Sequence, residues 1–187
     1  FNFIDIYFLF YVSSGLIVIL SYDLKKYKIP DEILFPAIVI SFMYRFLSLF
    51  PALSLLDETW HMVTLGNYIV AALIAAGFFL VIYLVSRGEW MGFGDVKLAI
   101  LLGLILGWPN ILLGIFLAFF FGAIIGLGLI ILDASLKVKK TSKESKKRQL
   151  LMTLKSQIPF APFLITGTFV AMFFGGKLLY WYIQLLS

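Results

Sequence analysis

Six long apolar stretches constrain the fold of this chain more than any other feature of its sequence. They are Phe3–Tyr22, Ile33–Phe50, Tyr68–Ser86, Val96–Trp108, Ile111–Leu132 and Phe160–Leu186. A helix needs roughly 20 mostly apolar residues to cross a hydrocarbon core of about 30 Å, and most of these stretches approach that length. Charged residues make up only 13% of the 187 residues, about half of their share in an ordinary soluble domain. The sequence therefore indicates an integral membrane protein.

The bilayer restricts such stretches to helices or closed barrels, because lipid offers the backbone no hydrogen-bond partner. A barrel strand would alternate apolar and polar residues, and the run Ile111–Phe121 does not alternate. We therefore predict the fold class all-α, a polytopic membrane helical bundle of about six transmembrane helices. Residues 1–187 would form a single membrane-embedded domain. The last stretch is long enough to tilt or to run out along the interface.

The basic residues are segregated among the connections between these stretches. Eight of the 15 Lys and Arg residues lie between Lys137 and Lys155, whereas Pro51–Asn67 contains none. Cytoplasmic loops carry the basic excess, so the first, third and fifth loops are predicted to be cytoplasmic and both termini to lie outside. Residues 133–158 would be a basic cytoplasmic loop. Arg45, inside an apolar stretch, is expected to snorkel or to pair within the bundle.

The basic loop also bears on partners. A polybasic segment beside a membrane gains roughly 1 kcal/mol per basic residue from anionic lipid, so contact with an anionic lipid bilayer is expected. Nucleic acid is not expected as a partner, because no aromatic residue that could stack on a base lies between Lys137 and Lys155.

Two acidic residues stand at the boundaries of apolar stretches rather than in the middle of loops. Asp23 follows the first stretch and Asp95 precedes the fourth. Ionisable groups in or beside membrane helices are costly and usually functional. The charge pattern puts both at the cytoplasmic boundary. Two carboxyls held close together share one proton, so one can accept a proton from water while the other donates to a carbonyl oxygen. This is the chemistry of aspartic proteolysis.

Gly92 and Gly94 flank Phe93 directly before Asp95. Glycine permits backbone dihedral angles that other residues avoid and allows another chain to approach closely, so this turn could receive an extended peptide. The alternative is that the glycines only interrupt the loop before a helix, with Asp95 as the N-cap residue. Taken alone, the tetrapeptide favours that alternative.

The surroundings of both acids resemble, in the same order, the motifs of the type IV prepilin peptidases, membrane aspartic proteases with a Gly-x-Gly-Asp motif. Asp23–Asp31 is similar to the first motif, an Asp eight residues before the Asp of a Leu/Ile-Pro-Asp turn. Gly88–Leu98 is similar to the second motif. Leu102–Trp108 fits the glycine-rich helix that follows, and Ile158–Phe163 resembles the proline-containing start of the last helix. The archaeal preflagellin peptidases and the presenilin group share only the Gly-x-Gly-Asp element.

The resemblance implies that Asp23 and Asp95 are the catalytic pair of an integral membrane aspartic endopeptidase. Such an enzyme cleaves the basic leader peptide from type IV prepilins or pseudopilins, after a glycine and at the cytoplasmic face. The expected partner is therefore the N-terminal segment of a prepilin. The expected location is the inner (cytoplasmic) membrane, as a multi-pass protein. An archaeal-type preflagellin peptidase is the alternative within the same chemistry.

The resemblance also suggests supporting residues. The Gly92–Gly94 turn would position the substrate. Asp31, which follows Pro30, matches a structural position and is expected to cap the second helix. Lys97 matches a basic position two residues after Asp95, where it would either tune that carboxylate or snorkel to the lipid head groups.

An acid pair requires neither a metal nor an organic cofactor for proteolysis. Bacterial members of the family commonly carry an N-terminal region with two Cys-x-x-Cys pairs, associated with methyl transfer, and this sequence has no cysteine. We therefore expect neither zinc nor S-adenosylmethionine to bind here, whether that region has been removed or is naturally absent. Trp90 stands where the family usually has glycine. A Mg²⁺ ion held by Asp23, Asp31 and Asp95 is a further alternative.

Two other functional classes compete with the protease. A proton- or cation-coupled membrane transporter would use acids inside the bundle, although its site is expected near the membrane midplane between inverted repeats, and no repeat is visible. A purely structural membrane protein would explain glycines such as Gly122, Gly126 and Gly128 through close helix packing. It would leave the paired acidic motifs unexplained.

Overall fold

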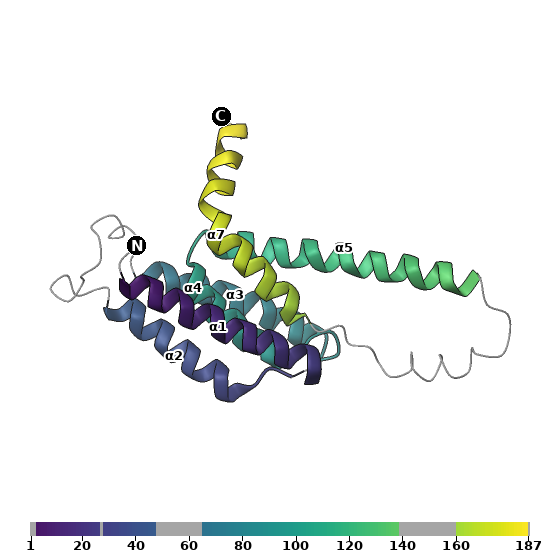
Figure 1. The fold of residues 1–187 in the computed structure, drawn as a ribbon, viewed down its shortest axis with the longest axis horizontal. Helices are drawn as coiled ribbons and strands as arrows, with labels where there is room; N and C mark the ends of the chain where they lie inside the picture. Colours follow the sequence, from purple (N-terminus) through teal and green to yellow (C-terminus); the bar gives the residue numbers. More distant parts are fainter. Residues whose placement is uncertain (1–2, 27, 48–64, 139–159, 187) are drawn as a thin grey trace.

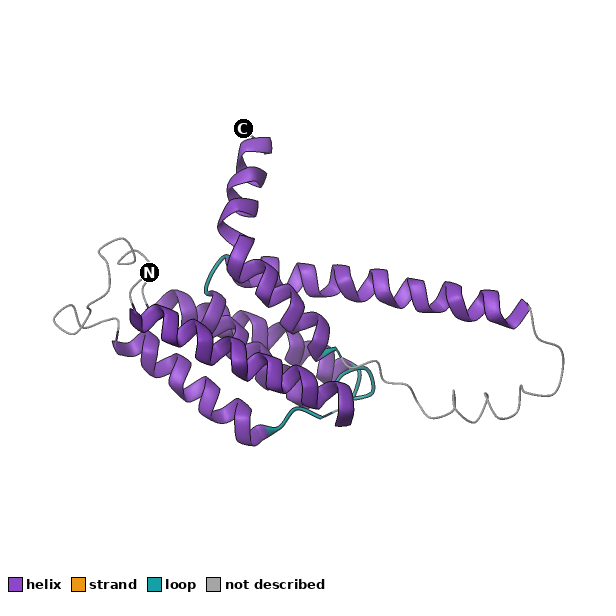
Figure 2. Cartoon of the chain, viewed as in Figure 1, coloured by secondary structure: helices purple, strands orange, loops and turns teal. Residues whose placement is uncertain are grey.

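The computed structural model describes residues 3–26, 28–47, 65–138 and 160–186. These residues form six helices and no strand (Figures 1 and 2). The helices are α1 (Phe3–Lys26), α2 (Asp31–Leu47), α3 (Leu65–Val85), α4 (Phe93–Leu106), α5 (Asn110–Val138) and α7 (Ala161–Leu186). Each helix begins within three residues of a predicted apolar stretch, whereas α1 and α5 run four and six residues past the predicted ends. The prediction of an all-α membrane helical bundle is confirmed.

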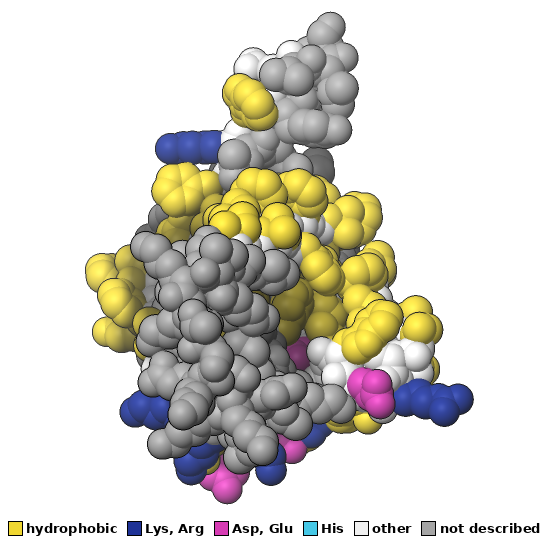
Figure 3. Space-filling model, turned by 90° about the vertical axis from the view of Figure 1, so that its right-hand side faces the viewer, with side chains coloured by type: hydrophobic (Ala, Val, Ile, Leu, Met, Phe, Trp, Pro, Cys, Tyr) yellow, Lys and Arg dark blue, Asp and Glu magenta, His cyan; other side chains and the backbone are white. Residues whose placement is uncertain are grey.

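Three helices within the described residues are long and apolar enough to cross a membrane: Phe3–Lys26, Leu65–Val85 and Asn110–Gly128. A shorter apolar helix covers Ala161–Lys177. Lipid-facing apolar side chains are accordingly numerous, and they cover much of the upper part of the end view in Figure 3.

The shortest of the described helices, α4, lies at the centre of the bundle. It packs against α2, α3, α5 and α7, and ten of its 14 residues are buried. A helix that is apolar on all sides is expected to be enclosed by its neighbours. At 1.5 Å per residue, α4 is only about 21 Å long. Because other helices surround it, α4 does not itself have to match the thickness of the bilayer.

Small residues bring two pairs of helices into close contact. A Cβ atom added to Gly103 of α4 would lie 2.3 Å from the Cα atom of Ala72 in α3, and one added to Gly167 of α7 would lie 2.5 Å from the carbonyl oxygen of Gly114 in α5. Such contacts let helix backbones approach in membranes. Of the three glycines named for close packing under the structural alternative, Gly122 lies against Phe163 of α7, with an added Cβ 3.6 Å from that ring, whereas Gly126 and Gly128 would meet no atom within 4 Å.

Arg45 pairs within the bundle, which was one of the two alternatives predicted for it. Its Nε and Nη2 atoms donate to the carbonyl oxygens of Leu104 and Ile105 at 3.3 and 3.0 Å. The guanidinium carbon lies 3.8 Å from the ring centroid of Tyr68. The last carbonyls of a helix have no partner within it, so Arg45 of α2 satisfies the C-terminal end of α4.

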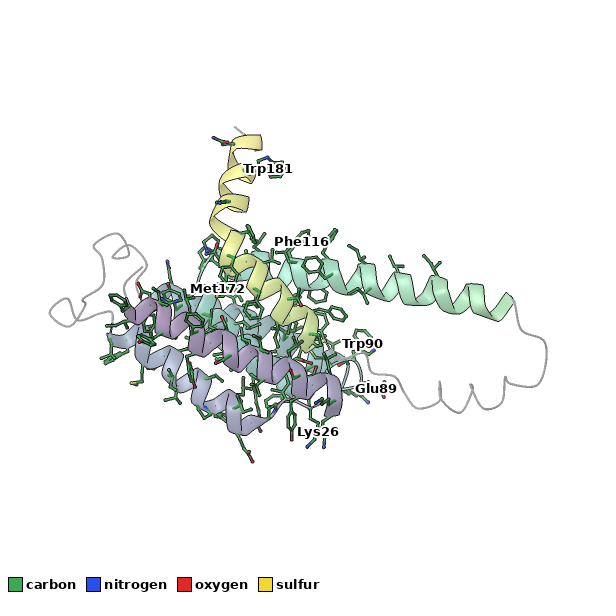
Figure 4. All side chains as sticks on the ribbon, viewed as in Figure 1. Lys26, Glu89, Trp90, Phe116, Met172 and Trp181 are labelled. Carbon is green, nitrogen blue, oxygen red and sulfur yellow. The ribbon has the colours of Figure 1, made fainter. Side chains whose placement is uncertain are left out.

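The last helix leaves the bundle over its C-terminal part. Figure 1 shows α7 changing direction midway, and Figure 4 places Met172 before the bend and Trp181 beyond it. Gly175 and Gly176 lie between these residues, and glycine pairs are common sites of sharp kinks.

The connection between α1 and α2 and the turn between α3 and α4 lie at the same end of the bundle, where Figure 4 labels Lys26, Glu89 and Trp90. Charged side chains gather around the lower part of this end in Figure 3. The other loops used to predict topology fall largely outside the described residues. Of the predicted basic loop 133–158, residues 133–138 belong to α5, and the remainder is not described.

Candidate active site

Asp23 belongs to the buried face of α1. The buried residues of this helix are Phe8, Val12, Leu16, Ile19 and Asp23. They are spaced by three or four residues, which is the periodicity of one helix face. The apolar stripe that packs into the bundle thus ends in a carboxyl group, of which only 5% is exposed. A charged residue at this register faces the protein and not the lipid.

Asp95 lies in the first turn of α4 and is 8% exposed. The helix begins after Gly92, whose extended backbone (φ −74°, ψ 149°) makes it the N-cap residue, and no side chain caps the helix there. The backbone N–H of Asp95 donates to the carbonyl oxygen of Gly92 at 3.1 Å. The carboxylate of Asp95 in turn accepts a hydrogen bond from the backbone N–H of Gly92, as the third residue of a capping box does. The alternative that Asp95 is itself the N-cap is therefore wrong.

The two acids interact. The negative charge of Asp23 acts on the carboxyl group of Asp95, although no Cα atom in the described residues of α1 lies within 8 Å of one in α4. Both helices pack against α2 and α7, and their buried side chains belong to one apolar core. The two acids thus lie near enough for their charges to interact, although the backbones of their helices stay apart.

One oxygen of this pair has no hydrogen-bond partner among the residues that the structure describes. Asp23 Oδ2 is buried and accepts no hydrogen bond from the described part of the chain. A buried, unsatisfied carboxylate oxygen is costly. Sharing one proton between two neighbouring carboxyls lowers that cost, because only one of them then carries a charge. The arrangement suits an acid pair in which one member is neutral.

The two glycines of the turn have different surroundings. A Cβ atom added to Gly94 would lie 3.2 Å from Cβ of Ile29, whereas one added to Gly92 would meet only the backbone nitrogen of Gly94 at 3.9 Å. The expectation of an open backbone therefore holds at Gly92 and is wrong at Gly94, which Ile29 covers. Phe93 between them is 48% exposed and packs edge-on against Tyr83, with the ring centroids 5.4 Å apart.

Asp31 and Lys97 form an ion pair that links α2 to α4. Lys97 Nζ donates to Asp31 Oδ1 at 2.9 Å and to Oδ2 at 2.8 Å. The carbonyl oxygen of Pro30 accepts the first helical hydrogen bonds of α2, from the N–H groups of Ile33 and Leu34. Pro30 therefore occupies the cap position. The predicted capping role of Asp31 is wrong, and so is the predicted snorkelling of Lys97.

The ion pair also bears on the alternative of a Mg²⁺ ion held by Asp23, Asp31 and Asp95. One of these three carboxylates, that of Asp31, is already paired with Lys97. Among the described residues no group of three His, Cys, Asp or Glu side chains could hold a metal ion.

Sequence reasoning missed Ile29 and Tyr83. Ile29 lies within the segment that resembles the first motif, between the acid and the proline, but nothing in its position shows that it packs on Gly94. Tyr83 lies at the end of an apolar stretch that offers no polar or periodic signal to distinguish it.

Comparisons with known proteins agree with the motifs. Curated proteins named "Prepilin leader peptidase/N-methyltransferase" are similar to this chain. The protein from Aeromonas hydrophila is 27% identical over 172 residues, which cover 90% of this chain and 49% of that protein. The protein from Stutzerimonas stutzeri is 26% identical over 92% of this chain and 51% of its own length. The protein from Legionella pneumophila is 33% identical over 61% of this chain and 36% of its own length.

The chain therefore spans about half the length of the first two of these relatives. No solved structure matches it. A family model described as "Type IV leader peptidase family" matches residues 10–127. That range is more than half of the 187 residues, and it contains Asp23, Asp31 and the whole Gly92–Asp95 segment. The chain belongs to the type IV leader peptidase family.

Proposed function

We propose that this chain is an aspartic endopeptidase that removes the basic leader peptide from type IV prepilins or pseudopilins. One observation carries the proposal: two buried aspartates from separate motifs interact electrostatically at one end of the bundle. Membership of the leader peptidase family and relatives named prepilin leader peptidase/N-methyltransferase support the substrate class.

The carboxyl pair supplies the two proton transfers that peptide hydrolysis requires. The ionised member accepts a proton from the attacking water while the neutral member donates one to the carbonyl oxygen of the scissile peptide bond. The backbone N–H of Gly92 donates to the Asp95 carboxylate. A hydrogen bond to the charged form favours that form, but burial and the neighbouring charge of Asp23 act in the opposite direction on Asp95. The pair as a unit therefore holds one shared proton, and the role of base or acid is not assigned to either member.

The substrate would approach along the open side of the Gly92–Gly94 turn. Gly92 leaves its surroundings free and the neighbouring Phe93 is half exposed, so an extended leader could run beside this backbone. The apolar segment that follows the leader would pack against the bundle. The acid pair requires no metal or organic cofactor for this step, and methyl transfer is not assigned to these residues.

The site would face the cytoplasm in the inner membrane. The basic residues Lys25, Lys26, Lys28 and Arg87 lie at the site end of the bundle, and loops rich in Lys and Arg remain cytoplasmic. Both chain ends would then lie outside, and the basic residues after α5 would contact anionic lipid. A transporter is less well supported, because the acids lie at one end of the bundle and not at its middle.

A cleavage assay tests the proposal. Purified protein in detergent or lipid is incubated with a prepilin whose leader ends in glycine, and the products are identified by mass spectrometry. Cleavage after that glycine is expected for the wild type and none for the Asp23→Asn/Asp95→Asn double variant. Equal cleavage by a well-folded double variant would disprove the aspartic mechanism, and no cleavage by the wild type would disprove the assigned substrate.

A further inference from the structure

Two contacts join the segment after Asp23 to the segment around Asp95, and neither involves the two acids. Ile29, in the connection between α1 and α2, covers Gly94, whose added Cβ would lie 3.2 Å from the Cβ of Ile29. Two residues further along, Asp31 pairs with Lys97 through both carboxylate oxygens. Together, the contact of Ile29 with Gly94 and the ion pair of Asp31 with Lys97 form an interhelical clamp.

The clamp lies where it can set the separation of the two acids. It begins six residues after Asp23 and ends two residues after Asp95. Helices α1 and α4 do not approach each other closely through their backbones, so their spacing at this end depends on the elements that join them. The connection between α1 and α2 is one of these, and it is held on the first turn of α4 by the clamp.

The surroundings of Lys97 keep its ammonium group at this place. Its Nζ atom lies 5.2 Å from the ring centroid of Phe35 in α2 and 5.6 Å from that of Phe93 in α4. Both distances are within the range of a cation–π interaction. The side chain of Lys97 is only 23% exposed, against 52% for Asp31. Within the pair, Lys97 is therefore the side chain that its surroundings hold in place, and Asp31 is the more exposed partner.

We propose that Lys97 is a positioning residue, which holds the connection between α1 and α2 against α4 through Asp31 and so keeps the carboxyl groups of Asp23 and Asp95 at their working separation. The inference rests on the proposed protease function. In this proposal Lys97 affects the acid pair by binding Asp31. Its charge does not act directly on Asp95.

The two actions predict opposite results for Asp31→Asn. If Lys97 acts through the clamp, Asp31→Asn and Lys97→Met lower kcat alike, since either breaks the same ion pair. If Lys97 acts directly on Asp95, Asp31→Asn frees the ammonium group to act more strongly on that carboxylate, while Lys97→Met removes the action. The two variants would then shift the pH profile of kcat in opposite directions.

The kinetic experiment uses four variants of the protein with a prepilin substrate. We expect Lys97→Met and Asp31→Asn each to lower kcat roughly tenfold or more, because small errors in the placement of reacting groups are costly, while KM changes little. The double variant should be no worse than either single one, since members of one unit are not additive. Lys97→Arg should retain most of the activity. Wild-type kcat in Lys97→Met, or opposite pH shifts in the two single variants, would overturn the proposal.

A second measurement does not depend on catalysis. The chain has no cysteine, so the variant Ile29→Cys/Gly94→Cys carries a single pair of thiols. Its Cβ atoms would start 3.2 Å apart, close to the separation of about 3.5–4.5 Å in disulfides. Mild oxidation should cross-link them, as counted by the loss of free thiols in a maleimide gel shift. Adding Lys97→Met should slow this cross-linking severalfold, and Lys97→Arg should not.

The two measurements separate the clamp from the protease. If the wild type fails to cleave any prepilin but cross-linking slows in Lys97→Met, the clamp stands and the proposed function fails. If the wild type cleaves and cross-linking is as fast in Lys97→Met as in its parent, the clamp fails and the proposed function stands. Single-cysteine variants, which should retain their free thiol, control for reaction between molecules.

Discussion

Buried or partly buried charged side chains lie at both ends of α4, and they differ in how completely they are hydrogen-bonded. At the C-terminal end, Arg45 donates to two carbonyl oxygens and lies over the ring of Tyr68. Its neighbour Tyr44 donates a hydrogen bond to Asp5. At the N-terminal end, a buried oxygen of Asp23 accepts no hydrogen bond from the described residues, and the charge of Asp23 acts on a second acid, Asp95.

The difference indicates which charge serves the fold and which serves chemistry. Charged groups that only hold a structure together are normally fully partnered, since an unpaired buried charge is costly. Natural proteins break that rule mainly at functional sites, where the strain is offset elsewhere. The cluster around Arg45 satisfies the rule and the pair of Asp23 and Asp95 breaks it. The comparison therefore supports the acid pair as the site independently of the family motifs.

The largest effect is expected from removing either acid. Asp23→Asn and Asp95→Asn should each lower cleavage by roughly 10⁴-fold or more, and the double variant should be scarcely worse, because the members of a catalytic unit are not additive. Thermal unfolding in detergent should be unchanged or shifted upward, since Asn removes a buried charge.

Glu32→Gln is the matched control for the acid variants. Glu32 is an exposed acid in the first turn of α2, at the same end of the bundle, and its loss should leave the cleavage rate unchanged. Cleavage assays of all four variants together with their melting curves test the set. Independent, partial losses in the two single Asn variants would show that the acids do not act as a unit.

A substitution at the C-terminal end of α4 should lower the stability of the protein and leave its cleavage activity unchanged. Arg45→Met leaves two helix-terminal carbonyl oxygens without their donor, and hydrogen bonds to charged groups contribute about 1.5–3 kcal/mol each. We expect the free energy of unfolding to fall by about 2 kcal/mol, because water can replace part of the loss. Arg45→Lys should lose less. Full cleavage by the protein that remains folded is expected, so loss of cleavage without loss of stability would place this end in the site.

The apolar pattern was sufficient to predict the helices, because hydrophobic length is the main requirement of a membrane span. It also located both acids, since a charge at the boundary of such a stretch is conspicuous. The buried register of Asp23 could have been read from the spacing of Phe8, Val12, Leu16 and Ile19. The capping residue expected for α2 was wrong by one position, and the alternative that Asp95 caps α4 was off by three positions. Cap identity depends on backbone dihedral angles that residue type only weakly constrains.

The contacts between segments could not be predicted from the sequence. The packing of Ile29 on Gly94 and the pairing of Asp31 with Lys97 join positions 65 and 66 residues apart, and neither leaves a local periodic signal. For the same reason the sequence did not show which glycines pack against another helix: Gly122 does, and Gly126 and Gly128 do not. Gly103 and Gly167 resemble Gly126 and Gly128 in the sequence and differ only in whether another helix crosses at that point.

The smallest effect is expected at the N-terminal end of α4, next to the candidate site, where no side chain caps the helix. Gly92 is the N-cap residue but supplies no side chain to the helix, although Ser at this position accepts a hydrogen bond from a free backbone N–H. Its dihedral angles, φ −74° and ψ 149°, suit any residue. An added Cβ would meet only the nitrogen of Gly94, at 3.9 Å. The fold therefore does not require glycine here.

We expect Gly92→Ser to stabilise the protein slightly and to impair it as an enzyme. The new hydroxyl would cap the helix and raise the free energy of unfolding by a few tenths of a kcal/mol, about the difference between Ser and Gly at an N-cap. It would also occupy the open side of the turn, where the leader peptide is proposed to run, and so raise KM more than it lowers kcat. Gly94→Ser is the contrasting variant, because its side chain would press on Ile29 and should lower stability. Melting curves and steady-state kinetics of both variants decide the matter. If Gly92→Ser cleaves prepilin with unchanged KM, the substrate does not use this side of the turn, and the glycine has to be explained by the fold after all.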